Sequence, residues 1–225
     1  MKTANIIIHG FGGHTNEIEY LAAQLQLKGL ETYTVSLAGH GGTKKDLTAS
    51  SYTDWIASAK KTIDELTPEY QNINLIGFSM GGLISVHFAS MPELQKMVFI
   101  NTPIYYWNIK VILGDIIRDI RNKKFDNFNY YKESVISISV KSCIDFLKLL
   151  TKTKKMFKDV LKPSLILQCI NDATVYYHSA EYIKKKIGSP ANQKYYDGGC
   201  HQVFTYSPEL RDLLCDDIFN FLIAE

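Results

Sequence analysis

The sequence lacks the features that mark membrane, secreted and nucleic-acid-binding proteins. No apolar run is long enough to span a bilayer, and the three consecutive isoleucines near the start are too few for the apolar segment of a signal peptide. The net charge is only +2, from 25 basic and 23 acidic residues, so charge gives no argument for a nucleic-acid or anionic-membrane partner. We therefore expect a cytoplasmic protein with reduced thiols, no nucleic-acid partner and no stable membrane anchoring.

Cysteine is also scarce, and its spacing excludes the usual metal and redox motifs. The four cysteines are Cys143, Cys169, Cys200 and Cys215. No two of them form a C-x-x-C pair, so neither a zinc site nor a dithiol redox site is indicated. We expect no metal and no organic cofactor.

Short β-rich runs alternate with longer helical patterns along most of the 225 residues. Strands are predicted at residues 4–8, 31–37, 73–78, 96–103, 164–170 and 193–197. Helices are predicted at residues 20–29, 52–66, 80–90, 178–187 and 207–224. We expect Thr53 or Asp54 to cap the second helix and Ser207 to cap the last, with Pro208 at its first position. Such alternation predicts an α/β fold: a mostly parallel six-stranded sheet with helices on both faces.

One segment, residues 104–161, breaks this alternation. It is rich in aromatic residues and lysine, and its pattern is helical without a paired strand. We interpret it as a helical cap, or lid, inserted into an α/β core formed by residues 1–103 and 162–225. The segment leaves the carboxyl end of a predicted strand, where the sites of open α/β sheets lie. Its lysines, including Lys152 and Lys154, are interpreted as a solvated helix face.

The pattern G-x-S-x-G occurs at residues 77–81, with Ser79 at its centre. It follows a predicted strand and precedes a predicted helix, which is the context that this pattern requires. Gly77 and Gly81 are expected because a Cβ at either position would collide with a neighbouring strand or helix. We therefore predict that Ser79 is a nucleophile. We also expect the turn to direct the backbone N–H of Met80 toward the place where an oxyanion would form.

A serine nucleophile needs a base, and one histidine is well placed to be that base. The six histidines are His9, His14, His40, His87, His178 and His201. His201 alone lies in a loop between the last strand and the last helix, after glycines that let the loop reach over the sheet. His87 and His178 lie in or at helices, where a structural role is expected, and His40 is expected to brace its loop.

The base in turn needs a carboxylate, for which Asp172 is the main candidate. Asp172 follows the fifth predicted strand and so lies at the same sheet end as Ser79. Asp197, near His201 in sequence, remains an alternative. Other candidates lie in the predicted cap and are expected to face solvent: Asp115, Asp119, Asp126 and Asp145. The chain order is then Ser79, Asp172, His201.

The glycine-rich stretch HGFGG, residues 9–13, follows the first predicted strand at that same sheet end. The N–H of Phe11 is the expected second oxyanion donor, beside that of Met80. We expect His9 to hold the loop in shape. A phosphate-binding role is the alternative, but the stretch lacks the Lys-Ser/Thr of a P-loop and the spacing of G-x-G-x-x-G.

Together these motifs resemble the α/β-hydrolase superfamily along the whole chain, and more closely its small bacterial carboxylesterase and monoacylglycerol lipase group. The motifs are HGFGG (9–13), LAGHG (37–41), DL (46–47), DW (54–55), GFSMGG (77–82), PIYYWN (103–108), DATV (172–175) and the late His201. The resemblance implies a core that starts at what is usually the third strand, a helical cap, and hydrolysis of short- to medium-chain acyl esters. One departure is Cys200, which stands where the group usually has glycine before the histidine.

We therefore expect a serine carboxylic ester hydrolase that acts on a small-molecule acyl ester through an acyl-enzyme. The acyl pocket is predicted to involve Phe11, Met80, Ile104, Tyr105 and Trp107. The alternative for these residues is that they only pack the cap onto the core.

Other functions stay open at this point. A thioesterase, an aryl (cinnamoyl-type) esterase or a C–C hydrolase uses the same three residues, and a ligand-binding module on a hydrolase scaffold is a further alternative. A homodimer is compatible with the sequence, which leaves both the oligomeric state and the natural substrate open.

Overall fold

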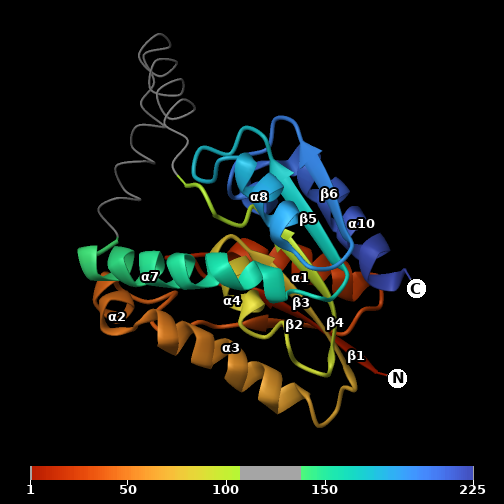
Figure 1. The fold of residues 1–225 in the computed structure, drawn as a ribbon, viewed down its shortest axis with the longest axis horizontal. Helices are drawn as coiled ribbons and strands as arrows, with labels where there is room; N and C mark the ends of the chain where they lie inside the picture. The colour runs from red at the N-terminus through yellow and green to blue at the C-terminus, as the bar shows by residue number, and fades with distance from the viewer. Residues whose placement is uncertain (1, 107–137, 225) are drawn as a thin grey trace.

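The computed structural model describes residues 2–106 and 138–224, which form a parallel sheet covered by helices (Figure 1). The six strands of the sheet are β1 (Thr3–Ile8), β2 (Thr32–Val35), β3 (Asn72–Phe78), β4 (Leu94–Ile100), β5 (Ser164–Cys169) and β6 (Ala191–Tyr196). Their order is β2-β1-β3-β4-β5-β6, and every pairing is parallel. The predicted fold class is thus confirmed.

Helices cover both faces of this sheet. One face carries α1 (Asn16–Leu27), α9 (Val203–Tyr206) and α10 (Pro208–Ile223). The other carries α3 (Tyr52–Leu66), α4 (Met80–Val86), α7 (Val140–Met156) and α8 (His178–Lys186). The short helices α2 (Lys44–Ala49) and η1 (Phe157–Asp159) contact α7, which runs across the sheet beside α3 in Figure 1. None of the helices in the described part is long and apolar enough to cross a membrane.

The strand sequences explain the two-sided cover. In β1, Ile6 and Ile8 join the core cluster under α3 and α4, whereas Ile7 joins the cluster under α1 and α10. Side chains alternate between the faces of a strand, and all three isoleucines are fully buried. A continuous apolar strand is therefore what a doubly covered parallel sheet requires.

The predicted cap of α3 needs a correction, and the predicted cap of α10 has the right position without the expected side-chain bond. The cap of α3 is Ser51 rather than Thr53 or Asp54, because the Asp54 carboxylate accepts bonds from the Ser51 N–H at 2.9 Å and hydroxyl at 2.6 Å. This is a capping box, with the acid three residues inside the helix. At α10, Ser207 precedes Pro208 as predicted. Its hydroxyl, however, accepts a bond from the N–H of Cys200 at 3.2 Å instead of capping the helix.

The end of the predicted cap packs directly on the core. Leu149 of α7 is fully buried in the same cluster as α3, α4 and the strands, and Thr153 of α7 meets His87 at 2.9 Å. Asp145, which was expected to face solvent, is instead 5% exposed and paired with lysines of its own helix, so that expectation was wrong. The remaining acidic candidates lie in residues 107–137, outside the described residues, and the division into core and cap stays a prediction.

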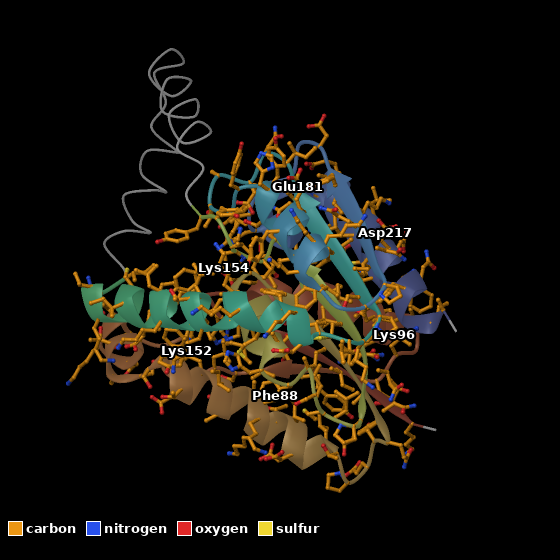
Figure 2. The ribbon with its side chains drawn as sticks, viewed as in Figure 1. Phe88, Lys96, Lys152, Lys154, Glu181 and Asp217 are labelled. Atoms are coloured by element: carbon orange, nitrogen blue, oxygen red, sulfur yellow. The ribbon has the colours of Figure 1, made fainter. Side chains whose placement is uncertain are left out.

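Two lysines of α7, which Figure 2 labels, lie over tyrosine rings. Lys154 Nζ is 4.7 Å from the ring centre of Tyr105 and 4.9 Å from that of Tyr182, and Lys152 Nζ is 4.9 Å from that of Tyr52. Such contacts favour a cation over the ring face. Lys154 therefore ties α7 to α8 and to the segment after β4, whereas Lys152 is exposed as expected.

Candidate active site

Ser79 lies in a strained turn between β3 and α4. Its φ is 52° and its ψ is −122°, a conformation that non-glycine residues rarely adopt, and its N–H donates to Ile100 O at 2.8 Å. A Cβ on Gly77 would lie 2.3 Å from Gly82, and one on Gly81 would lie 2.0 Å from the carbonyl oxygen of Ile8. The two glycines are thus required by the close approach of helix and strand.

The structure brings Ser79, His201 and Asp172 into one chain of hydrogen bonds. His201 Nε2 is 2.9 Å from Ser79 Oγ, and His201 Nδ1 is 2.7 Å from Asp172 Oδ2. The other oxygen of the fully buried Asp172 accepts from the N–H groups of Thr174 and Val175, both at 2.8 Å. Because the carboxylate only accepts, the imidazole proton belongs on Nδ1, and Nε2 faces the serine as the acceptor.

The electrostatics around the Ser79–His201–Asp172 hydrogen bonds favour a charged imidazole during the reaction. Burial lowers the pKa of His201, but the charge and hydrogen bond of Asp172, together with the charge of Glu17, outweigh burial and raise the pKa above 6.5. Asp197, the alternative partner, is exposed and makes no bond to His201. The residue at the imidazole is therefore Asp172.

Asn101 supports the histidine and was missed in the sequence. It follows β4 with a φ of 45°, its Nδ2 donates to His201 O at 3.0 Å, and its Oδ1 accepts from the N–H of Cys169 at 2.9 Å. The side chain thereby joins the end of β5 to the histidine loop. The available signal was a polar residue directly after a buried strand at the same sheet end.

His9 joins the glycine-rich loop to the loop after β2. Its Nδ1 lies 2.9 Å from Gly10 O, and its Nε2 accepts from the N–H of Leu37 at 3.4 Å. Burial lowers the pKa of His9 to about 4, so the ring is neutral, with its proton on Nδ1. The ring of His40, whose pKa burial also lowers, lies 5.3 Å away. Both residues hold loops, as the sequence indicated.

The glycine-rich loop lies directly against the serine. A Cβ on Gly10 would be 3.3 Å from Ser79 Cβ. Neither the N–H of Phe11, in this loop, nor that of Met80, at the start of α4, has a hydrogen-bond acceptor within the described ranges. The residue after Gly10 and the residue after Ser79 thus each carry an unpaired backbone donor.

An aromatic group extends from this loop to α7. The ring of Phe11 stacks on Phe146 at 5.1 Å between centroids, and Phe146 in turn contacts Tyr106 at 6.0 Å. We call Phe11, Phe146 and Tyr106 the aromatic wall. Tyr106 lies in the PIYYWN stretch, between the pocket candidates Tyr105 and Trp107, whereas Phe146 lies in no motif and was missed by sequence reasoning.

The remaining predicted pocket residues have other surroundings. Met80 and Ile104 are buried in the larger core cluster, and Tyr105 packs against Tyr182 and Lys154. Trp107 lies outside the described residues. The side chains of Met80, Ile104 and Tyr105 thus have packing partners, and their role in the acyl pocket stays a prediction.

Cys200 occupies its position before His201 without backbone strain. In the loop that carries it, the positive φ belongs to Gly198, at 86°, and Cys200 is not among the residues with positive φ. Burial raises the pKa of the Cys200 thiol, which keeps it protonated near neutral pH and limits its reactivity. Within the described ranges, no three His, Cys, Asp or Glu side chains are grouped to hold a metal ion.

Comparison with known proteins decides the family. Residues 1–207 match the model of the Hydrolase_4 family, described as serine aminopeptidase S33. The chain belongs to this family. It is 25% identical over 227 residues to a carboxylesterase of Bacillus subtilis (strain 168), covering 97% of this chain and 92% of that protein. It is also 25% identical over 195 residues to a thermostable monoacylglycerol lipase of Bacillus sp. (strain H-257), covering 82% of this chain and 76% of that protein.

Solved structures agree on the fold of this family member. A structure reported with LipS and LipT, two metagenome-derived lipolytic enzymes, superposes with a TM-score of 0.80 at 18% identity, covering 98% of this chain and 93% of the other. The monoacylglycerol lipase of Paleococcus ferrophilus superposes with a TM-score of 0.72 at 17% identity, covering 97% of this chain and 93% of the other. The protein is an α/β hydrolase of the esterase and monoacylglycerol lipase type.

Proposed function

We propose that the protein hydrolyses carboxylic esters through an acyl-enzyme on Ser79. The observation that carries the proposal is the continuous hydrogen-bond chain from Ser79 Oγ through His201 to Asp172, at 2.9 and 2.7 Å. The family and the two bacterial relatives support the ester as the substrate class.

The proposed reaction has two halves. His201 Nε2 takes the proton of Ser79 as Oγ attacks the ester carbonyl, and Asp172 stabilises the imidazolium. The imidazolium then protonates the leaving alcohol, the C–O bond breaks, and the acyl group stays on Ser79. Water, deprotonated by His201, attacks this acyl-enzyme and releases the acid.

The proposed oxyanion donors are the N–H groups of Phe11 and Met80. Met80 follows Ser79 in the chain, and Phe11 follows Gly10, whose Cβ would lie 3.3 Å from that of Ser79. Neither N–H has an acceptor within the described ranges, so each is free to bind the negative oxygen of the tetrahedral intermediate. Preorganised donors of this kind each contribute about 10²–10³ in rate.

The aromatic wall is the proposed contact for the acyl group. Phe11 carries one oxyanion donor on its backbone and stacks on Phe146 through its ring, which places an apolar surface next to the reacting carbonyl. An apolar surface favours apolar acyl chains, since burial of each CH₂ contributes about 0.8 kcal/mol.

Shortening Phe146 is expected to change chain-length preference. Phe146→Ala removes the ring that stacks on Phe11, so kcat/KM for p-nitrophenyl octanoate should fall about tenfold or more, whereas p-nitrophenyl acetate should be affected less than threefold. Phe88→Ala, at a ring buried in the larger core cluster just after α4, is the matched control. It should lower stability without changing the ratio of kcat/KM for the octanoate to that for the acetate. If the ratio of kcat/KM for the octanoate to that for the acetate is unchanged in Phe146→Ala, the Phe146 ring does not contact the acyl group.

An aryl (cinnamoyl-type) esterase is the second candidate, favoured by the stacked rings of Phe11 and Phe146. Wild-type protein should be assayed with p-nitrophenyl butyrate, methyl cinnamate and butyryl-coenzyme A. A kcat/KM that is highest for the aliphatic ester supports the first proposal, and one highest for the cinnamate supports the second. Preference for the thioester, or no turnover of any ester, contradicts both.

A further inference from the structure

A second carboxyl group lies beside the Ser79–His201 pair. Glu17, near the start of α1, accepts a hydrogen bond at Oε1 from Gln202 Nε2, 2.9 Å away. Its Oε2 would lie 2.0 Å from a Cβ on Gly13 and 3.4 Å from one on Gly10. The carboxyl therefore fills the space that glycine leaves in the glycine-rich loop (residues 9–13, the oxyanion loop from here on), between this loop and the turn that carries His201.

The environment of this carboxyl is unusual for a glutamate. Glu17 Oε2 is buried and has no hydrogen-bond partner in the part of the chain that is described. A buried carboxylate oxygen without a partner costs free energy unless a nearby cation compensates it. Glu19, two residues along the same helix, is exposed, so of these two glutamates only Glu17 has a buried carboxylate oxygen without a partner. The positive charge that offsets this burial most is the imidazolium of His201, and His14 adds a smaller contribution.

We propose that Glu17 is a positioning residue that holds the His201–Gln202 turn against the oxyanion loop and stabilises the His201 imidazolium through its charge. The inference deepens the proposed function and rests on it. Asp172 occupies Nδ1 of the imidazole and Ser79 faces Nε2, so Glu17 acts through space and through Gln202. It belongs to α1, an element separate from those that supply the other three residues.

The charged and titratable groups around the pair favour this role. His201 is faced by the carboxylates of Asp172 and Glu17, and Glu17 by the imidazoles of His201 and His14. Burial raises the pKa of Glu17, while the positive charge of His201, the nearby backbone of Gly10, the bond from Gln202 and the charge of His14 lower it. The Cys200 thiol, whose pKa burial raises, stays neutral. A negative Glu17 therefore raises the affinity of His201 for its proton.

The test is Glu17→Gln, which keeps the size of the side chain and an oxygen that accepts from Gln202, but removes the charge. In the wild type, kcat/KM for p-nitrophenyl butyrate should fall as the pH is lowered. The midpoint of this fall, the acid limb of the pH profile, should lie above pH 6.5, because the pKa of His201 is raised. In Glu17→Gln this limb should move to lower pH by about half a unit or more. At the pH plateau kcat should fall about three- to tenfold, because a less basic imidazole accepts the serine proton less readily.

Three further variants separate charge from shape. Glu19→Gln, on the exposed side of α1, should have the same pH midpoint of the acid limb and the same kcat as the wild type. Gln202→Met removes the donor and keeps the charge of Glu17, so it should lower kcat without moving the limb to lower pH. If Glu17→Gln does not fold, Glu17→Ala removes the same charge without burying an amide, and the same shift is expected.

A readout independent of turnover distinguishes failure of this inference from failure of the proposed function. The pKa of His201, measured by NMR titration of its ring protons, should fall in Glu17→Gln whether or not the substrate class is right. An unchanged pKa and an unchanged acid limb overturn the role of Glu17, even if kcat falls. Wild-type protein that hydrolyses no ester while the NMR shift occurs contradicts the proposed function alone.

Discussion

Ser79→Ala is expected to lower the hydrolysis of p-nitrophenyl butyrate by about 10⁴-fold or more, leaving at most the contribution of the oxyanion donors and substrate binding. The hydroxyl is the only group removed, and it is the one bonded to His201 at 2.9 Å. Alanine has the same difficulty as serine at a φ of 52°, so the turn itself should be destabilised little. The measurement is kcat with purified protein, beside a thermal melt.

The matched control for this variant is a serine remote from the site. Ser189 Oγ donates to the carbonyl of Lys162 near the start of β5, at the sheet end opposite His201. Ser189→Ala should therefore keep wild-type kcat, although it loses one hydrogen bond. Activity of Ser79→Ala within tenfold of the wild type would remove Ser79 from the reaction.

Asp172→Asn is expected to lower kcat by about 10⁴-fold through a change of tautomer. Oδ1 of Asp172 already accepts from the N–H groups of Thr174 and Val175, so an amide at this position must keep its oxygen there. Its NH₂ group would then face His201 Nδ1, which must become the acceptor. The proton would move to Nε2, which would donate to Ser79 and no longer accept its proton.

Asp197→Asn is the control that decides between the two aspartates near the histidine. Asp197 is exposed and should tolerate the change with near wild-type kcat. Steady-state rates across the pH range, with NMR of the His201 ring nitrogens for the tautomer, check both variants. A large loss in Asp197→Asn with little loss in Asp172→Asn would reverse the assignment.

The parts of the site that follow strands directly could be predicted, because their sequence pattern is local. Ser79 is marked by glycines that close packing requires, and Asp172 and His201 each follow a strand of a parallel sheet, whose carboxyl ends lie at one edge. Their proximity followed from topology alone.

The supporting residues could not be predicted, because they depend on packing between distant segments. Asn101 follows β4 at the sheet end of the site, but its bond to the histidine turn, like that of Gln202 to Glu17 of α1, is set by packing that no spacing rule encodes. Phe146 meets Phe11 only because α7 packs across α3 and α4. The cap of α3 at Ser51 was, in contrast, readable from Asp54 three residues later, and the error lay in choosing a later residue.

The central claim, that Ser79 carries the acyl group, is tested most directly by covalent trapping. Wild-type protein treated with a fluorophosphonate should gain one adduct by intact mass, and peptide mapping should place it on Ser79, with loss of ester hydrolysis in proportion to labelling. Full hydrolysis after complete treatment with no adduct on Ser79, or an adduct on another residue that tracks the loss, would contradict the account.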